Sequence, residues 1–439
     1  MLRLAMPVVL AELGWMSMGI VDTIMVAPLG PAAIGAAGIG NALHIAFAIF
    51  GMGLFLGLDT LVSQAYGAGD HRDCHRWLMH GLVLAVLSAG PIMLLCAVVL
   101  AAIPTLGFHP EVEPLLQGYF GVIVWSTLPL LLYAALRRYL QGIHAVVPVA
   151  FALVTANLVN AATNKLLIYG GAGVPALGVP GAAWATVASR LYMLVVLWLA
   201  VRYYDRVRDS GFEAVSRHIS RLRLARLRQL GFPAALQVSI EVIAFALATA
   251  LAGKLDPVSS ASHQLALNIA SAAFMVPLGI ASAGAVRVGN RVGAGDPQGA
   301  ARAGWTALAL GGLFMSAVSL LFVIMPEAFI GVFSPGPAVL ALGASLLLIA
   351  AVFQLLDGLQ AVATGVLRGL GETRIPMRVN LVGHWFIGLP LGYGLCFVLG
   401  AGVRGLWIGL SAGLIVCGTI LTWVWHRRIT HYLETGSPR

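Results

Sequence analysis

Residues 235–251 read ALQVSIEVIAFALATAL, a run in which sixteen of the seventeen residues are uncharged and the other is Glu241. A run of this apolarity is typical of a helix that spans a bilayer, because a hydrocarbon core of about 30 Å needs about 20 apolar residues. A carboxylate in such a helix is costly, so Glu241 is expected to have a function. The stretch predicts both a membrane fold and a candidate site.

The whole chain, like this stretch, is rich in apolar residues and poor in charged ones. Of its 439 residues, 59% are hydrophobic and 10% are charged, and the mean hydropathy is +0.92. Soluble domains carry about 25% charged residues, so the composition excludes a soluble globular protein and predicts an integral membrane protein. The opening residues MLRLAMPVVLAELGW run on without an A-x-A-like cleavage site, which predicts that the first apolar run is retained. Whether further residues precede it stays open.

Apolar windows separated by proline, glycine and charge clusters predict an all-α protein with twelve transmembrane helices. The spans are expected at 4–28, 32–63, 77–102, 114–137, 146–169, 179–201, 231–253, 258–288, 303–326, 338–366, 377–399 and 404–425. Alternate loops hold 22 of the 26 basic residues. By the positive-inside rule, this asymmetry places both termini in the cytoplasm of a plasma membrane, the inner membrane in bacteria.

The net charge of +9 follows from these inside loops, which face anionic lipid, and nucleic acid is not expected as a partner. The basic segment 202–230 interleaves leucines and arginines at helical spacing. It is interpreted as an amphipathic cytoplasmic linker on the inner leaflet.

The chain partly overlays itself when it is shifted by 226 residues. Pro7 then falls on Pro233, Gly53 falls on Gly279, and YGAGD (66–70) falls on VGAGD (292–296). Because each copy holds six spans, the copies enter the membrane in the same direction and form parallel repeats. The expected architecture is therefore two pseudo-symmetric six-helix lobes, at 1–201 and 231–439, joined by the linker. Such lobes with a cleft between them are typical of alternating-access secondary transporters.

Other motifs narrow the function classes. The glycines of each GAGD allow a sharp turn, and Asp70 or Asp296 can cap the following helix. The sequence holds no G-x-x-x-x-G-K-[ST] motif, so transport driven by nucleotide hydrolysis within this chain is not predicted. The four cysteines lack C-x-x-C spacing, which argues against a disulfide framework or a zinc site. His71 and His75 are four residues apart but are interpreted as solvated, and no metal site is expected.

Ionisable residues within the predicted spans are the default functional candidates. Asp59 and Lys165 lie near span ends, where snorkelling explains them. Arg190 is expected in a structural ion pair. Glu12 lies ten residues before Asp22, which places it on a different helix face. The remaining candidates are Asp22, Glu241 and Asp357.

The polar candidates form one group in each lobe. Asp22 lies fifteen residues beyond Pro7, about 22 Å along its span at 1.5 Å per residue. Asn160 and Asn164 share one face at i and i+4, and Thr186 lies just inside the outer end of its span. One carboxylate surrounded by neutral side-chain oxygens is a chemically suitable binding site for a monovalent cation or a proton.

The second lobe carries two acids. Glu241 and Asp357 lie at nearly the same depth, about 12 Å from the inner ends of their spans. Two carboxylates at one level could hold Na⁺ between them, or one of them could take up and release a proton. The repeat offset places Trp15 opposite Glu241 and Ala248 opposite Asp22, so the chemistry is not duplicated.

Several stretches resemble a known transporter family. MVPLGIASAGAVRVGNRVGAGD (275–296), preceded by SASHQLALNIA (260–270), is similar to a motif of multidrug and toxic compound extrusion (MATE) transporters. VDTIMVAPLG, DTLVSQAYGAGD, LGVPGAAWAT and GVLRGLGETRIPM resemble other parts of that family, over nearly the whole chain. Glu241 in IEVIAF resembles the NorM-like branch.

The resemblance implies the MATE fold and export of cationic, often aromatic amphiphiles, driven by protons or Na⁺. It implies coupling acids at Asp22, Glu241 and Asp357. Asn160 matches the family's asparagine, whereas Asn164 stands where many members have aspartate and NorM-like members often have asparagine. One titratable group of the family's first-lobe site is therefore missing.

The expected function is a cation-coupled drug antiporter, a monomer surrounded by membrane lipid, with no cofactor besides the coupling ion. Trp15, Phe245, Phe274 and Phe353 are predicted to line the substrate cleft through apolar and cation–π contacts. The alternative is a flippase for polyprenyl- or lipid-linked sugars, which uses a related fold but needs cations for pyrophosphate. An enzyme is not expected, since no nucleophile, base and orienting group occur at matched spacing.

Overall fold

The structure is a computed structural model that describes residues 1–171, 173–208 and 218–437. Within these residues twelve helical spans are long and apolar enough to cross a bilayer, which confirms the predicted all-α membrane fold. They are Arg3–Leu29, Pro31–Gly67, His71–Thr105, Glu113–Gly142, Val147–Tyr169, Val179–Val207, Arg221–Ala252, Pro257–Gly293, Pro297–Ile324, Pro337–Leu370, Arg374–Val398 and Gly402–Thr435.

Several spans are built from more than one helix. The first six comprise α1 (Leu2–Val26), α2 (Pro31–Leu54), α3 (Leu56–Gly67), α4 (His71–Ala102), α5 (Glu113–Ile123), the short η3 (Val124–Ser126), α6 (Thr127–Gly142), α7 (Val147–Tyr169) and α8 (Val179–Arg208). The others comprise α9 (Arg221–Ala252), α10 (Pro257–Gly293), α11 (Pro297–Ile324), α12 (Pro326–Gly331), α13 (Pro337–Leu370), α14 (Arg374–Leu381), the π-helical η5 (Val382–Gly388), α15 (Leu389–Tyr393), the π-helical η6 (Gly394–Val398) and α16 (Gly402–Thr435).

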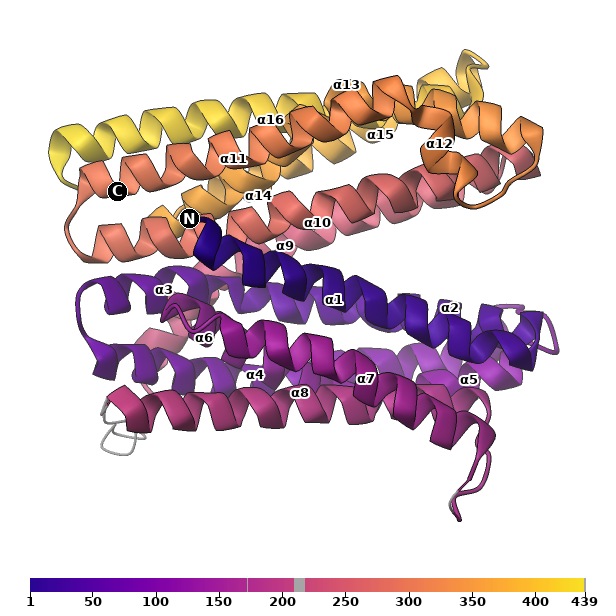
Figure 1. Cartoon of the computed structure of the whole chain (residues 1–439), viewed down its shortest axis with the longest axis horizontal. Coiled ribbons are helices and arrows are strands. Elements are labelled where there is room, and N and C mark those ends of the chain that lie inside the picture. Colours follow the sequence, from indigo (N-terminus) through magenta and orange to yellow (C-terminus); the bar gives the residue numbers. More distant parts are fainter. Residues whose placement is uncertain (172, 209–217, 438–439) are drawn as a thin grey trace. The chain divides into compact units, whose positions relative to one another are not determined.

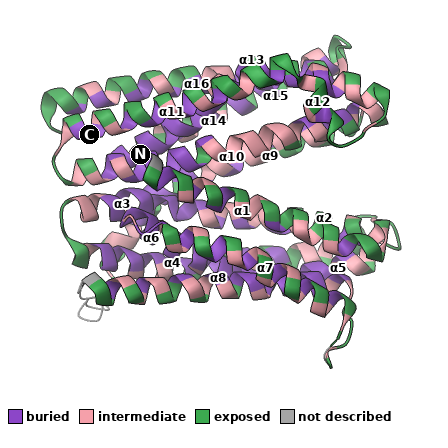
Figure 2. Ribbon diagram, in the orientation of Figure 1, coloured by how far each residue is buried: buried purple, intermediate pink, exposed green. Residues whose placement is uncertain are grey.

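The outward helix faces are apolar, as expected for a protein solvated by lipid. Along α8 the exposed side chains include Trp184, Leu191, Val195 and Leu199. Figure 2 shows exposed turns along α8, whereas α3 and α6 are mostly buried. Burial of backbone groups in helices and exposure of apolar side chains together satisfy the constraints of a hydrocarbon solvent.

The helices pack into two compact units. One unit comprises Leu10–Ala235, and the other comprises Met1–Val9 together with Leu236–Arg439. Figure 1 shows α7 beside α8 in the first unit and α13 beside α16 in the second. Both boundaries fall inside a helix, α1 or α9, and they are 226 residues apart, the offset of the sequence repeat.

The predicted linker 202–230 lies partly outside the described residues. Its described parts continue α8 to Arg208 and begin α9 at Arg221. The predicted amphipathic character of 209–217 concerns residues that the structure does not describe.

The two GAGD motifs make the same turn. The Asp70 N–H donates to the Ala65 carbonyl, and the Asp296 N–H donates to the Arg291 carbonyl. Each aspartate caps the next helix, as predicted: Asp70 accepts from the Asp73 N–H at 2.8 Å and Asp296 accepts from the Gly299 N–H at 2.7 Å. The latter bond holds the pKa of the partly exposed Asp296 carboxyl below its usual value. Only the second glycine of each motif has a positive φ, +77° at Gly69 and +65° at Gly295.

The equivalent glycines of the repeat make equivalent close contacts. A Cβ placed on Gly53 in α2 would lie 2.5 Å from the Ala235 Cα of α9. A Cβ placed on Gly279 in α10 would lie 2.9 Å from the Val9 Cα of α1. Val9 and Ala235 are themselves 226 residues apart, so α1 and α9 pack against equivalent glycines in the same way.

We expect Gly53→Ala to destabilise its unit, because the methyl group meets backbone that has no room to yield and overpacking costs about 1–3 kcal/mol. Gly38→Ala is the matched control on the same helix, since a Cβ there meets nothing within 4 Å. Thermal unfolding of the detergent-solubilised protein measures both. Equal unfolding temperatures for the two variants would contradict the close-contact role.

Candidate functional site

The polar residues predicted for the first lobe lie together in the structure. The carboxylate of Asp22 on α1 accepts hydrogen bonds at Oδ1 from Asn160 Nδ2 (3.0 Å) and Asn164 Nδ2 (2.8 Å) on α7. At Oδ2 it accepts from Thr186 Oγ1 on α8 (3.2 Å). Asn160 and Asn164 are completely buried and Thr186 is 3% exposed. Three helices therefore converge on one carboxylate through neutral groups.

This cluster retains an unused oxygen. Asn164 Nδ2 also donates to Asn160 Oδ1 at 3.1 Å, but Asn164 Oδ1 is buried without a hydrogen-bond partner. A carboxylate with an amide oxygen beside it is a ligand set that suits hard cations. Lys165, the next residue, is exposed and lies outside the cluster.

Arg190 departs from its prediction. It lies one helical turn beyond Thr186 on α8 and is 3% exposed. Its Nη1 donates to Ser126 Oγ and approaches His44 Nδ1 at 3.4 Å. Among the described residues it forms no ion pair with a carboxylate, so the expected structural ion pair is not present. Its partners come from loops and helices far apart in sequence, which no local pattern reveals.

The second unit holds the other two acids. Glu241 on α9 accepts at Oε2 from Gln237 Nε2 (3.2 Å) and from Gln360 Nε2 on α13 (3.3 Å). Asp357, 9% exposed on α13, interacts electrostatically with Glu241. Over the described parts of the chain, neither acid has an ion-pair partner, and Asp357 makes no hydrogen bond.

Sequence reasoning did not select the neutral partners of Glu241. Gln237 precedes Glu241 by four residues, and Gln360 follows Asp357 by three, so helical spacing in an apolar run is a signal for both. Gln360 Nε2 also donates to Asn380 Oδ1 at 2.9 Å, and Gln360 Oε1 is buried without a partner. This site, like the first, has an unused amide oxygen near a carboxylate.

A π-helical turn lies next to this network. Within η5, His384 is 1% exposed and its Nδ1 lies 3.1 Å from the carbonyl of Asn380. Phe245 packs edge-on against His384, with ring centroids 6.1 Å apart. Single π turns inside membrane or soluble helices occur frequently at functional sites.

Two further intramembrane acids are paired with arginines. Glu12 binds Arg137 of α6, and both are 8% exposed. Asp59 is completely buried, and its Oδ2 lies 3.4 Å from Arg138 Nη1. Asp59 therefore does not snorkel, contrary to expectation, and both arginines lie within α6 rather than in a basic loop. These pairs account for the charges structurally.

The predicted aromatic residues occupy different environments. Trp15 is partly buried against the core of its own unit, and Phe274 is partly exposed. Phe353 is 5% exposed, in the packed core of the second unit beside Trp407, with ring centroids 6.4 Å apart. Phe353 therefore faces no open space in this structure, because its ring is covered by neighbouring side chains.

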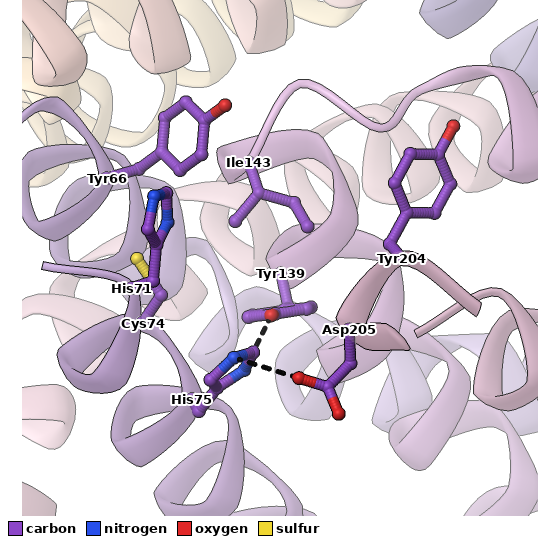
Figure 3. Close-up of a pocket in the computed structure, with 8 residues that line it drawn as sticks. All are labelled: Tyr66, His71, Cys74, His75, Tyr139, Ile143, Tyr204 and Asp205. Carbon is purple, nitrogen blue, oxygen red and sulfur yellow. Dashed lines mark hydrogen bonds and ion pairs between the residues drawn. The ribbon is translucent and has the colours of Figure 1, made fainter. Parts of the chain in front are cut away.

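The histidine pair in the first turns of α4, His71 and His75, is only half solvated. His71 is exposed, but His75 is 2% exposed. Its Nδ1 lies 2.8 Å from the Tyr139 hydroxyl and its Nε2 lies 3.7 Å from Asp205 Oδ1. Figure 3 shows these side chains around a small pocket. Across the described ranges, no group of three or more histidine, cysteine or acidic residues is arranged to hold a metal.

Comparison with known proteins reproduces the repeat. The MatE family profile matches residues 7–166 and, a second time, residues 233–394. The two matches begin 226 residues apart. The chain is 38% identical over 448 residues to the multidrug resistance protein NorM of Burkholderia vietnamiensis, covering 100% of this chain and 95% of the relative. It is 36% identical to the probable multidrug resistance protein NorM of Mesorhizobium japonicum, covering 97% and 93%.

Solved structures share the fold. The crystal structure of the eukaryotic MATE transporter AtDTX14 superposes with a TM-score of 0.87 at 22% identity, covering 99% of this chain and 98% of that one. A MATE crystallised in complex with MaL6 gives a TM-score of 0.88 at 21% identity, covering 99% and 96%. Taken with the two profile matches and the full-length relatives, this likeness shows that the chain belongs to the multidrug and toxic compound extrusion (MATE) family of transporters, in its NorM-like branch.

Proposed function

We propose that this protein is a secondary active antiporter that exports cationic, amphiphilic drugs in exchange for inward-moving Na⁺ or H⁺. The two curated relatives described above are named as multidrug resistance proteins, which supports drug export as the class of activity. Drug resistance in the names of these relatives favours a transporter over an enzyme and does not favour the alternative of a flippase for lipid-linked sugars. Arg137, which is buried, and Arg138, which is partly buried, each pair with a carboxylate, so neither of these two arginines is available to a pyrophosphate.

The observation that carries the coupling proposal is the placement of two acids where α9 meets α13. Gln360, about one helical turn from Asp357 on α13, donates to Glu241 on α9, and within the described residues the hydrogen bonds to Glu241 come from the neutral amides of Gln237 and Gln360. Like charges in a low-dielectric interior cannot both persist without a proton or a cation. The pair therefore has two states, loaded and empty, that differ by one positive charge.

Such a pair can bias a conformational equilibrium. A bound cation removes the repulsion between α9 and α13, and its release restores that repulsion. A ligand shifts a two-state equilibrium only by its difference in affinity for the two states. Loading from the side with the higher cation concentration then favours the state that releases the drug outside. The Asp22 cluster supplies a second carboxylate on which the same cation can act.

The hydropathy of the helices and the charge of the loops indicate the membrane in which the protein resides. The twelve spans and the NorM relatives make the chain an integral membrane protein, and the basic loops support a bacterial inner membrane with both termini in the cytoplasm.

We propose a monomer, because each unit holds its own complete carboxylate cluster. Aromatic side chains beside the second cluster, such as Phe245, suit organic cations through cation–π contact.

The proposal is tested in proteoliposomes by imposing a Na⁺ gradient and a proton gradient separately, with the membrane potential clamped. We expect one of the two gradients to drive ethidium export against the dye's own gradient. Liposomes without protein are the control for leakage. Export that neither gradient changes would refute antiport, and the identity of the effective gradient assigns the coupling ion.

A further inference from the structure

A buried positive charge lies next to the first carboxylate cluster and has no part in the function proposed so far. Arg190 is 3% exposed, and its hydrogen-bond partners in the described residues, Ser126 and His44, are neutral groups. Its Nε is buried without a hydrogen-bond partner. A guanidinium inside a membrane helix bundle is expensive, so its retention without an ion pair needs a reason.

The contacts of Arg190 fix it in place. Because the guanidinium can only donate, Nδ1 of His44 is the acceptor at 3.4 Å. His44 Nε2 then carries the hydrogen and donates to Thr127 Oγ1 at 3.0 Å. His44, Ser126 and Thr127 are all completely buried, on α2, η3 and α6. Three elements therefore hold the cation at one position.

Asp22 is the carboxylate that this fixed charge acts on. Arg190 and Thr186 are four residues apart on the same face of α8, and Thr186 donates to Asp22 at 3.2 Å. Asp22 and Arg190 interact electrostatically, and the buried Tyr119 interacts with both. The two opposite charges attract each other across the cluster without forming a direct ion pair.

We propose that Arg190 is a fixed internal cation that keeps the affinity of the Asp22 cluster for its coupling cation low enough for release in each transport cycle. This inference rests on the proposed function, because it assumes that Asp22 binds Na⁺ or H⁺. When the cluster is empty, the charges of Asp22 and Arg190 balance. When it is loaded, one positive charge remains uncompensated in the protein interior. Arg190 acts through Asp22 and is a positioning residue that does not touch the ion.

The test measures the concentration of the driving cation that gives half-maximal ethidium export. Loss of a unit charge that acts over roughly 10 Å in an interior of effective dielectric constant about 20 changes binding on the order of tenfold. We expect Arg190→Gln to lower the half-saturating concentration by about tenfold and to slow maximal export, because the ion leaves more slowly. Arg190→Lys keeps the charge and is expected to behave like the wild type.

Lys165→Gln is the matched control. It removes the same formal charge next to Asn164 in sequence, but its side chain is exposed and lies away from the cluster. We expect no change in the half-saturating concentration. If the effect came only from the net charge of the protein, Arg190→Gln and Lys165→Gln would lower the half-saturating concentration equally. That result would overturn the proposal.

The outcomes separate this inference from the proposed function. If no gradient drives export in the wild type, the proposed antiport fails first. If Asp22→Asn leaves the cation dependence of export unchanged, antiport stands and the role of Arg190 falls. If folded Arg190→Gln has an unchanged or higher half-saturating concentration of the driving cation, Arg190 is merely structural. Should Arg190→Gln not fold, Ser126→Asp places a compensating carboxylate beside the same guanidinium. That variant must then also lower the half-saturating concentration.

Discussion

Gradient-driven export is expected to fall to the background of empty liposomes when Glu241 is replaced by glutamine. Glutamine keeps the size of the side chain and its reach to Gln237 and Gln360. It cannot carry the negative charge that attracts a cation, nor can it take up a proton. The pair with Asp357 then has a single charge state, and cation binding no longer biases the two conformations.

The measurement separates coupling from folding. Thermal unfolding of the Glu241→Gln protein is expected to match or exceed that of the wild type, because one buried like-charge interaction is removed. Downhill dye exchange without an ion gradient is expected to remain. Glu327→Gln, the same chemical change at an exposed position of the second unit, is the control and should leave export intact. Full gradient-driven export by Glu241→Gln would show that Glu241 has no coupling role.

Comparison with Asp22→Asn assigns the coupling to a lobe. If both variants lose gradient-driven export, the two clusters act together. If only one does, coupling belongs to the unit that holds that residue. This comparison matters because both clusters have a carboxylate, neutral amide donors and an unused amide oxygen, at Asn164 or Gln360.

The largest effect on stability is expected from breaking the buried pair of Glu12 and Arg137. Arg137→Met leaves Glu12 uncompensated in a helix bundle, with both side chains at most 10% exposed in the intact protein. Loss of one partner of a buried ion pair costs about 3–5 kcal/mol. We expect a marked fall in the apparent unfolding temperature and in the yield of monodisperse protein.

The double variant distinguishes the pair from simple loss of volume. Glu12→Gln combined with Arg137→Met removes both charges, and the replacement of a complete buried pair is often close to neutral. The double variant is therefore expected to recover most of the stability. Arg72→Met, at an exposed position of the same unit, is the control. A double variant that is as unstable as Arg137→Met would show that the ion pair is not the cause.

The number of spans and their repetition could be predicted from the sequence, because lipid imposes a one-dimensional rule. A helix must be apolar over its length across the bilayer, and loops can be charged. The offset of 226 residues also followed from the alignment of Pro7, Gly53 and GAGD with their second copies, because matching residues at a fixed separation are visible in the sequence itself. The grouping of Asn160 and Asn164 followed from their i, i+4 spacing, and their approach to Asp22 followed from similar depth.

Which side chains on neighbouring helices contact each other was decided by helix packing. Neither the depth of a residue in its span nor the spacing along one helix predicts that packing. Asp59 and Asp22 are both aspartates in apolar spans, yet Asp59 pairs with Arg138 and Asp22 accepts from two amides. Arg137 is the last residue of the predicted span 114–137, but α6 continues to Gly142 and Arg137 pairs with Glu12 inside the unit. Phe353 lies in a packed core because α16 places Trp407 over it. A helix can present a residue at the same depth to lipid, to a neighbour or to water by rotation about its axis, and only tertiary contacts select among these.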